Sequence, residues 1–464
     1  MDRAHLDRLL LEHVRTAGLF PQPGTALLAV SGGPDSLALL DLFHAIAPEI
    51  ALDLAVAHVD HGILPESGRV AEQVAAIGAR YHVAVYVEVL ALGPDASETR
   101  ARRARYAALR SVQGRVGARY LVTAHHADDQ IETVLYRLFR GSGLSGLAGI
   151  QPLGPRGLVR PLLPFRRREL EQWLARRFPD PMARPPVYLD PSNADLRHDR
   201  AWIRSRVLPL LRQRFGDRFD RAMLDVAAHA VREREAWAAL LRAFPGLGFR
   251  SVEEGVEVSL QPLLAAEPAV AEALLRALAR EVGCLLGPRK SARVLGIVRG
   301  ASSGRAVELG EGFSAEVCFD RLRLAPAAGR QFPEPAAWGN DREGRVEWGA
   351  WELLWRPEHA GTSRRSGWVT WVEPGHGVIR AAAAGDRLVP LGGTGHRAVS
   401  RLLMEARVPR PMRRRYPVIL RGDELVWVPG VCRARAAVPQ PGAAAVRLEL
   451  KPREPRVGVG EAVA

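Results

Sequence analysis

Residues 31–36 combine two glycines, two hydroxyl groups and one carboxylate between an apolar run and a helix-like pattern. The glycines would let the backbone approach an anion closely, and the unpaired amides at the start of the following helix would lie at the positive end of its dipole. The segment is therefore expected to bind phosphate groups. Its members are Ser31, Gly32, Gly33, Pro34, Asp35 and Ser36.

The segment has no lysine after its last glycine, unlike the kinase-type phosphate loop. Asp35 stands there instead, and a carboxylate beside bound phosphates requires a divalent cation between the like charges. We therefore expect Asp35 to hold Mg²⁺. The alternative is a tight strand-to-helix turn without a ligand, with Pro34 at the first helical position.

A second group of acids and imidazoles follows the fourth apolar run. On a helix, Asp128 and Glu132 would share one side, with Asp129 about one residue-step away and His125 and His126 just before them. Such crowding shifts pKa values and suits metal binding, amine recognition or proton removal. A capped helix start facing solvent is the alternative.

The same helix has an apolar stripe, which predicts how it packs. Ile131, Leu135 and Leu138 recur at i, i+4 and i+7. We expect this stripe to face the sheet.

The elements that would position these groups form an α/β domain. Short apolar runs predict strands at 26–30, 54–59, 83–90 and 120–123, and helical patterns alternate with them at 36–47, 68–81, 97–112 and 128–140. This alternation is typical of a doubly wound parallel sheet. Ligands bind such sheets at the carboxyl ends of the strands, where both chemical groups are expected.

The rest of the chain predicts two further domains. We expect a first domain at 1–215, a small, mostly helical domain at 216–325, a linker with lead-in strands at 326–375, a C-terminal α+β domain at 376–450, and a tail at 451–464.

The composition bounds the partners. The 464 residues carry a net charge of +14, almost wholly from arginine, which suits a polyanion; the alternative is that arginine and alanine are abundant because of a GC-rich coding bias. No apolar run approaches 18 residues and the N-terminus lacks an export pattern, so we expect a cytoplasmic protein. The three isolated cysteines predict neither disulfides nor a Cys-x-x-Cys site.

The Ser-Gly-Gly-x-Asp-Ser pattern resembles the pyrophosphate loop of the N-type ATP pyrophosphatases, which cleave ATP to AMP and pyrophosphate. Segments 58–62, 98–106 and 125–133 together resemble the tRNA(Ile)-lysidine synthetases of that superfamily. Segments 385–392, 408–417 and 426–430 resemble the C-terminal domain of the same family. The resemblance therefore extends over nearly the whole chain, in the family's domain order.

The resemblance implies an ATP- and magnesium-dependent ligase. Its substrates would be free L-lysine and the wobble cytidine of tRNA(Ile) with a CAU anticodon, and an adenylated cytidine would be the intermediate. Lysidine, AMP and pyrophosphate would be the products, and decoding would change from AUG to AUA. Family members are often homodimers. A tRNA thiolation enzyme of the same superfamily is the nearest alternative.

The resemblance also assigns roles to residues. Catalysis would involve Asp35, Asp129, Arg102 and Arg105, with Asp129 or Asp35 as the base. His58 and His61 would border the adenosine, although a buried structural histidine is an equal alternative for His58. The lysine and ATP site would include Glu98, His125, Asp128 and Glu132. Contacts to tRNA would come from Arg200, Arg204, Arg410, Arg413, Arg414 and Arg415. A solvated basic surface is the alternative for the arginines.

Overall fold

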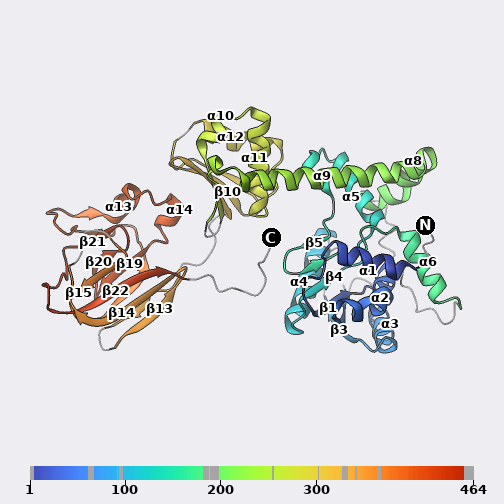
Figure 1. Cartoon of the computed structure of the whole chain (residues 1–464), viewed down its shortest axis with the longest axis horizontal. Helices are drawn as coiled ribbons and strands as arrows, with labels where there is room; N and C mark the ends of the chain where they lie inside the picture. Colours follow the sequence, from blue (N-terminus) through green and yellow to red (C-terminus); the bar gives the residue numbers. More distant parts are fainter. Residues whose placement is uncertain are drawn as a thin grey trace. The chain divides into compact units, whose positions relative to one another are not determined.

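The computed structural model describes residues 5–60, 67–90, 92–93, 98–180, 188, 198–252, 255–300, 302–326, 333–339, 342–362 and 367–453. The chain divides into two compact units, Met1–Glu235 and Ala236–Ala464. Helices and strands are labelled in Figure 1.

The first unit is built on a six-stranded sheet with the order β3-β2-β1-β4-β6-β5. All neighbouring strands are parallel except β5, which pairs with β6 in the antiparallel sense. The strands are β1 (Gly24–Ala29), β2 (Leu52–Asp60), β3 (Ala84–Val89), β4 (Tyr120–Val122), β5 (Leu153–Gly154) and β6 (Leu158–Val159). The predicted doubly wound α/β fold is confirmed.

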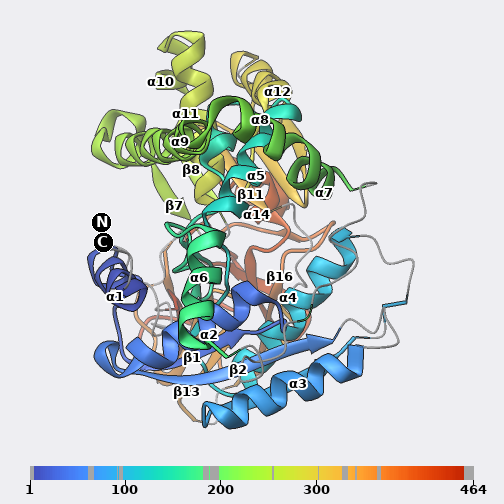
Figure 2. The ribbon, with the colours of Figure 1, turned by 90° about the vertical axis from the view of Figure 1, so that its right-hand side faces the viewer.

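Helices cover both faces of this sheet because the strands are apolar on both sides. Ala26 and Leu28 pack into one cluster with α1, α2, α3 and α6, whereas Leu27 between them packs into another with α4. Helix α3 packs against β2 and β3, and Figure 2 shows it beside β2. The helices are α1 (Leu6–Thr16), α2 (Pro34–Ile46), α3 (Ser67–Arg80), α4 (Glu98–Arg115), α5 (Ala127–Phe139) and α6 (Arg167–Arg177).

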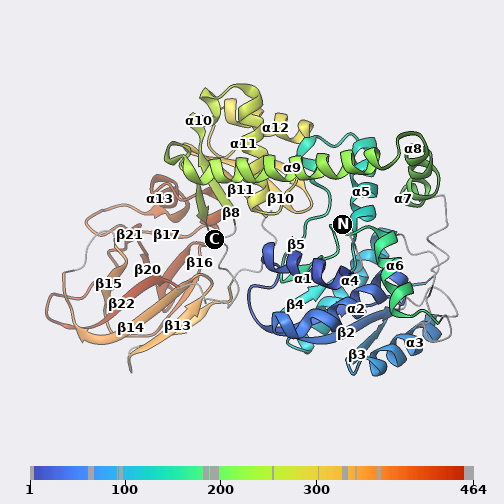
Figure 3. The same cartoon turned by 45° about the vertical axis from the view of Figure 1, so that its right-hand side comes forward.

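Helix α5 packs differently from the prediction. Its residues Ile131 and Leu135 are buried against Ile203 and Leu208 in a separate cluster, and Leu138 is exposed. The stripe therefore faces the segment that closes the unit, and the prediction that it faces the sheet is wrong. That segment consists of α7 (Asp199–Trp202), the π-helical turn η5 (Ile203–Val207), α8 (Leu208–Phe215) and the long helix α9 (Asp217–Ala243), seen well in Figure 3. The apolar period predicted a buried face but not which element would cover it.

The second unit begins with helices and a five-stranded antiparallel sheet of order β7-β8-β11-β10-β9. The helices are α10 (Leu260–Ala265), α11 (Pro268–Glu281) and α12 (Pro288–Arg299), and the strands are β7 (Arg250–Val252), β8 (Gly255–Ser259), β9 (Ala306–Gly310), β10 (Phe313–Cys318) and β11 (Arg321–Pro326). They share one apolar core. The domain expected to be mostly helical at 216–325 therefore contains a five-stranded sheet as well as its helices.

Two further antiparallel sheets follow, with orders β12-β16-β19-β20-β21 and β13-β14-β22-β15. Their strands are β12 (Ala336–Trp338), β13 (Gly344–Trp348), β14 (Trp351–His359), β15 (Val369–Val372), β16 (Gly377–Ala381), β19 (Pro417–Arg421), β20 (Glu424–Val428), β21 (Cys432–Arg433) and β22 (Ala444–Pro452). A pair, β17 (Arg387–Leu388) and β18 (Arg397–Ala398), precedes α13 (Val399–Glu405) and α14 (Arg410–Arg413). Within the described residues, no helix is long and apolar enough to span a membrane.

Candidate active site

The glycine-rich segment is the turn from β1 into α2, as predicted. Gly32 has φ +83°, and a Cβ there would lie 2.9 Å from Val70 Cγ1, so both backbone conformation and space favour glycine. Ser36 Oγ donates to the Gly33 carbonyl oxygen at 2.8 Å and accepts from the Ser31 amide at 3.1 Å. Pro34 begins α2, and Gly33 offers no side-chain cap to the helix amides. The turn therefore presents an uncapped helix start, which suits an anion.

This turn lies at a topological switch point. From β1 the chain continues to β2 on one side of the sheet, while β4 flanks β1 on the other side. The carboxyl ends of β1 and β4 are therefore neighbours, and the segments that follow them meet there. This arrangement brings residues 31–36 next to the start of α5.

Two predicted carboxylates converge on His126 at this point. His126 Nε2 lies 3.5 Å from Asp35 Oδ2 and 3.7 Å from Asp129 Oδ2. His126 also caps α5, because the Asp129 amide donates to His126 Nδ1 at 3.4 Å and the His126 amide donates to Asp129 Oδ2 at 3.0 Å. Burial lowers the pKa of His126, but Asp35, Asp129 and Asp128 outweigh this effect and raise its pKa. His126 is therefore the imidazole that joins the two acids.

His125 has a different environment. Its Nδ1 lies 2.8 Å from Thr123 Oγ1. Burial, followed by the positive charges of Arg160, Arg102 and Arg105, lowers the pKa of His125 to about 3. Arg102 and Arg105, the two predicted arginines of α4, therefore lie close enough to His125 to disfavour its charged form. The sequence alone did not distinguish a neutral His125 from a cation-favouring His126.

The other acids of α5 are held by arginines from later in the chain. Asp128 Oδ1 accepts from Arg212 Nη2 at 2.5 Å, and Asp128 Oδ2 accepts from the Arg167 amide at 2.8 Å. Burial raises the pKa of Asp128, but these donors and Arg166 together lower it. Glu132 accepts two hydrogen bonds from Arg204, at 2.5 and 2.9 Å. Both acids of α5 therefore have cationic partners within the protein.

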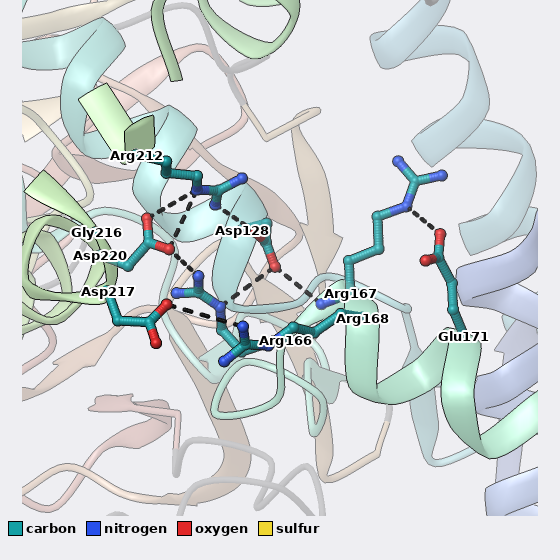
Figure 4. A pocket seen from close by; sticks show the side chains of 9 residues that line it. All are labelled: Asp128, Arg166, Arg167, Arg168, Glu171, Arg212, Gly216, Asp217 and Asp220. Atoms are coloured by element: carbon teal, nitrogen blue, oxygen red, sulfur yellow. Dashed lines mark hydrogen bonds and ion pairs between the residues drawn. The ribbon is translucent and has the colours of Figure 1, made fainter. Parts of the chain in front are cut away.

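A cavity of about 330 Å³ adjoins the start of α5 (Figure 4). Four arginines and four acids line it, with one glycine: Asp128, Arg166, Arg167, Arg168, Glu171, Arg212, Gly216, Asp217 and Asp220. Sequence reasoning missed all of these residues except Asp128. Asp220 is buried, and its place in an apolar helical pattern is the sequence signal that could have indicated a buried acid.

The remaining predicted residues are dispersed. His58 is buried, and its Nδ1 lies 2.9 Å from the Val30 carbonyl oxygen, as the structural alternative expected. The Arg200 guanidinium lies 5.5 Å from the centre of the Tyr136 ring. His61 and the side chain of Glu98 lie outside the described residues.

The basic cluster predicted for tRNA binding lies in the second unit. Arg410 and Arg413 belong to the short helix α14, and Arg414 and Arg415 follow it. Arg413 Nε donates to the Val408 carbonyl oxygen at 2.8 Å, which anchors that side chain locally.

The fold and the turn between β1 and α2 define a PP-loop ATP-binding protein, and the model of the PP-loop domain matches residues 6–211. The model described as TilS substrate C-terminal domain matches residues 378–450.

Relatives extend the likeness over the whole chain. The chain is 33% identical to a tRNA(Ile)-lysidine synthase of Symbiobacterium thermophilum, over 97% of this chain and 98% of that relative. It is 33% identical to that of Alkalilimnicola ehrlichii over 93% and 95% of the two chains, and 32% identical to that of Geobacter sulfurreducens over 90% and 91%. The chain belongs to the tRNA(Ile)-lysidine synthase family, whose members are ATP-dependent PP-loop ligases.

Proposed function

We propose that this chain joins free L-lysine to carbon 2 of the wobble cytidine, position 34, in the CAU anticodon of tRNA(Ile). The observation that carries the proposal is the convergence of Asp35 and Asp129 on His126 beside the open start of α2. A phosphate-binding turn and a proton acceptor are thereby adjacent, as adenylation followed by amine attack requires.

In the first step the cytosine carbonyl oxygen attacks the α-phosphorus of ATP, and the bond to the leaving pyrophosphate breaks. Negative charge grows on the leaving group, and the amides at the start of α2 would stabilise it. Arg102 and Arg105 act from the neighbouring helix α4. His58 and His61 would border the adenosine of ATP. His58 Nδ1 is also hydrogen-bonded to the Val30 carbonyl oxygen.

The residues present fit a magnesium ion. Asp35 Oδ1 is buried and receives no hydrogen bond from the described part of the chain, and its cationic neighbour Arg167 lies 3.8 Å away through Nε. The described residues contain no group of three or more His, Cys, Asp or Glu that could hold a metal. Mg²⁺ usually takes one or two carboxylates together with substrate phosphates, and Asp35 lies in the turn where the phosphates would bind. Asp35 would hold the ion, and the ion would neutralise phosphate charge.

In the second step the ε-amine of lysine attacks carbon 2, and AMP leaves with the former carbonyl oxygen. The free amine has a pKa of about 10.4 and must lose a proton before it attacks. Asp129 accepts that proton, with Asp35 as the other candidate, because both carboxylates border the same imidazole. Glu98, His125, Asp128 and Glu132 complete the proposed surroundings of lysine and ATP. The contacts of Asp128 and Glu132 with arginines would shape this site.

The tRNA would be held by arginines of both units. The cytidine must leave its stack to enter the site, which a single-stranded anticodon loop allows at low cost. Arg200 and Arg204 lie in the catalytic unit, and Arg204 also binds Glu132. Arg410, Arg413, Arg414 and Arg415 would contact tRNA phosphates from the second unit. We also propose that two copies of the chain form a homodimer.

The thiolation alternative is disfavoured by the cysteines. All three lie outside the PP-loop domain, and each is buried. Burial raises the pKa of Cys284, and burial together with Glu316 raises the pKa of Cys318 to about 12. A sulfur-transfer nucleophile needs an accessible thiolate near the adenylated base.

The test is lysine incorporation by the purified full chain. Radiolabelled lysine should enter a transcribed tRNA(Ile) with a CAU anticodon when ATP and Mg²⁺ are present, with AMP and pyrophosphate as products. A transcript with a changed wobble base is the matched control and should remain unlabelled. Release of ADP and phosphate during turnover, or sulfur transfer in place of lysine transfer, would contradict the proposal.

A further inference from the structure

Four charged side chains contact one another where α5, α6, α8 and α9 meet, on the wall of the cavity in Figure 4. We call Asp128, Arg166, Arg212 and Asp220 the quartet. The Asp220 side chain is only 5% exposed and that of Asp128 16% exposed. Buried charges of this kind persist only when they are paired.

The contacts of the quartet connect its members in a ring. Asp220 accepts a hydrogen bond from Arg166, and both of its oxygens lie 3.1 Å from Arg212 Nε. Arg212 Nη2 donates to Asp128 at 2.5 Å, and Arg166 Nε lies 3.7 Å from the other oxygen of Asp128. Two positive and two negative charges therefore balance within the set.

Asp128 connects the quartet to the proposed chemistry. It is the second residue of α5, between the capping histidine His126 and Asp129. Its Oδ2 also accepts from the amide of Arg167, the first residue of α6. With both oxygens held, Asp128 fixes the direction in which α5 begins, and so the position of the His126–Asp129 cap opposite Asp35.

We propose that Asp220 and Arg212 are positioning residues for the ligase reaction, which act through Asp128 to hold the start of α5 in register with the PP-loop. This inference rests on the proposed function. Both residues follow residue 211, where the PP-loop domain match ends. The junction of α8 and α9 would then contribute to the reaction rate by positioning α5, without contacting the substrate.

A neighbouring ion pair provides the contrast. Asp217 lies on the first turn of α9, three residues before Asp220, and its carboxylate is 3.8 Å from Arg168. The two side chains are 69% and 61% exposed. An exposed pair of this length adds almost nothing to stability. Asp217→Asn therefore makes the same charge change on the same helix without disturbing the quartet.

The experiment compares Asp220→Asn, Asp128→Asn, their double variant and Asp217→Asn in the full chain. A small displacement of reacting groups can cost about 100-fold in rate, so we expect kcat for lysine transfer to fall about 10- to 100-fold in the first two variants. In Asp220→Asn the KM for ATP should stay within about twofold, because Asp220 is held by Arg166 and Arg212 and lies outside the proposed lysine and ATP site. The double variant should fall no further than either single variant, and Asp217→Asn should match the parent.

Two readouts separate positioning from simple loss of structure. The single-turnover amplitude counts active sites, and a merely structural role would lower that amplitude and leave the rate constant unchanged. Arg212→Gln, at a partly exposed side chain, provides a milder variant if Asp220→Asn folds poorly, and it should give the same loss of rate constant. A parent-like rate constant in Asp220→Asn or Arg212→Gln, or additive losses in the double variant, would overturn the inference. A parent chain unable to incorporate lysine would instead overturn the proposed function.

Discussion

The bidentate pair between Glu132 and Arg204 allows a quantitative test of how the active-site helix is held. The Glu132 side chain is 7% exposed and that of Arg204 36% exposed. Arg204→Ala removes both hydrogen bonds, at 2.5 and 2.9 Å, and leaves a buried carboxylate without its cation.

The expected cost follows from this geometry. Removing one partner of a buried pair costs roughly 3–5 kcal/mol, and the partial exposure of Arg204 admits water, so we expect about 3 kcal/mol. For a unit of this size, each kcal/mol shifts the midpoint by roughly 2–4 °C, so the catalytic-unit transition should fall by about 6–12 °C.

The measurement is thermal unfolding of the full chain, followed through the transition of the catalytic unit. Arg206→Ala, an exposed arginine two positions later, should stay within about 0.5 kcal/mol of the parent. The apolar double variant Glu132→Leu with Arg204→Met should recover most of the loss, because it leaves no unpaired charge. A stability of Arg204→Ala within about 0.5 kcal/mol of the parent would refute this reasoning.

Three other outcomes follow from the same site. Asp35→Ala should abolish both adenylation of tRNA and lysine transfer, measured as AMP formation and label incorporation; parent-like activity would contradict the magnesium argument. Arg414→Ala should weaken tRNA binding and reduce the slope of log K against log salt by about 1, with ATP binding as the unchanged control. His125 has a folded pKa of about 3, below its unfolded value, so it stabilises above pH 6.5 and that contribution is lost as pH falls toward 3. His125→Asn should therefore flatten the acid-side loss of unfolding free energy, and an unchanged slope would count against the burial of a neutral imidazole.

Local order in the catalytic unit was predictable from the amino-acid sequence. The β1–turn–α2 segment, the four parallel strands and the helices between them follow from glycine conformation and from apolar periodicity, which act over a few residues. Burial on both faces of the sheet likewise follows from continuous apolar runs such as 26–28. The family likewise followed from short motifs that hold their spacing along the chain.

Tertiary structure alone decided which charges meet. Asp128 pairs with Arg212, 84 positions away, and Glu132 with Arg204, 72 positions away. It also decided that α5 packs against α8 and α9, and that His126 rather than His125 lies between Asp35 and Asp129. The periodicity of a sequence can show that one face of a helix is apolar or charged. Which charged residues pair across 72 or 84 positions depends on how whole helices pack, and the conformational preferences of neighbouring residues do not determine that packing.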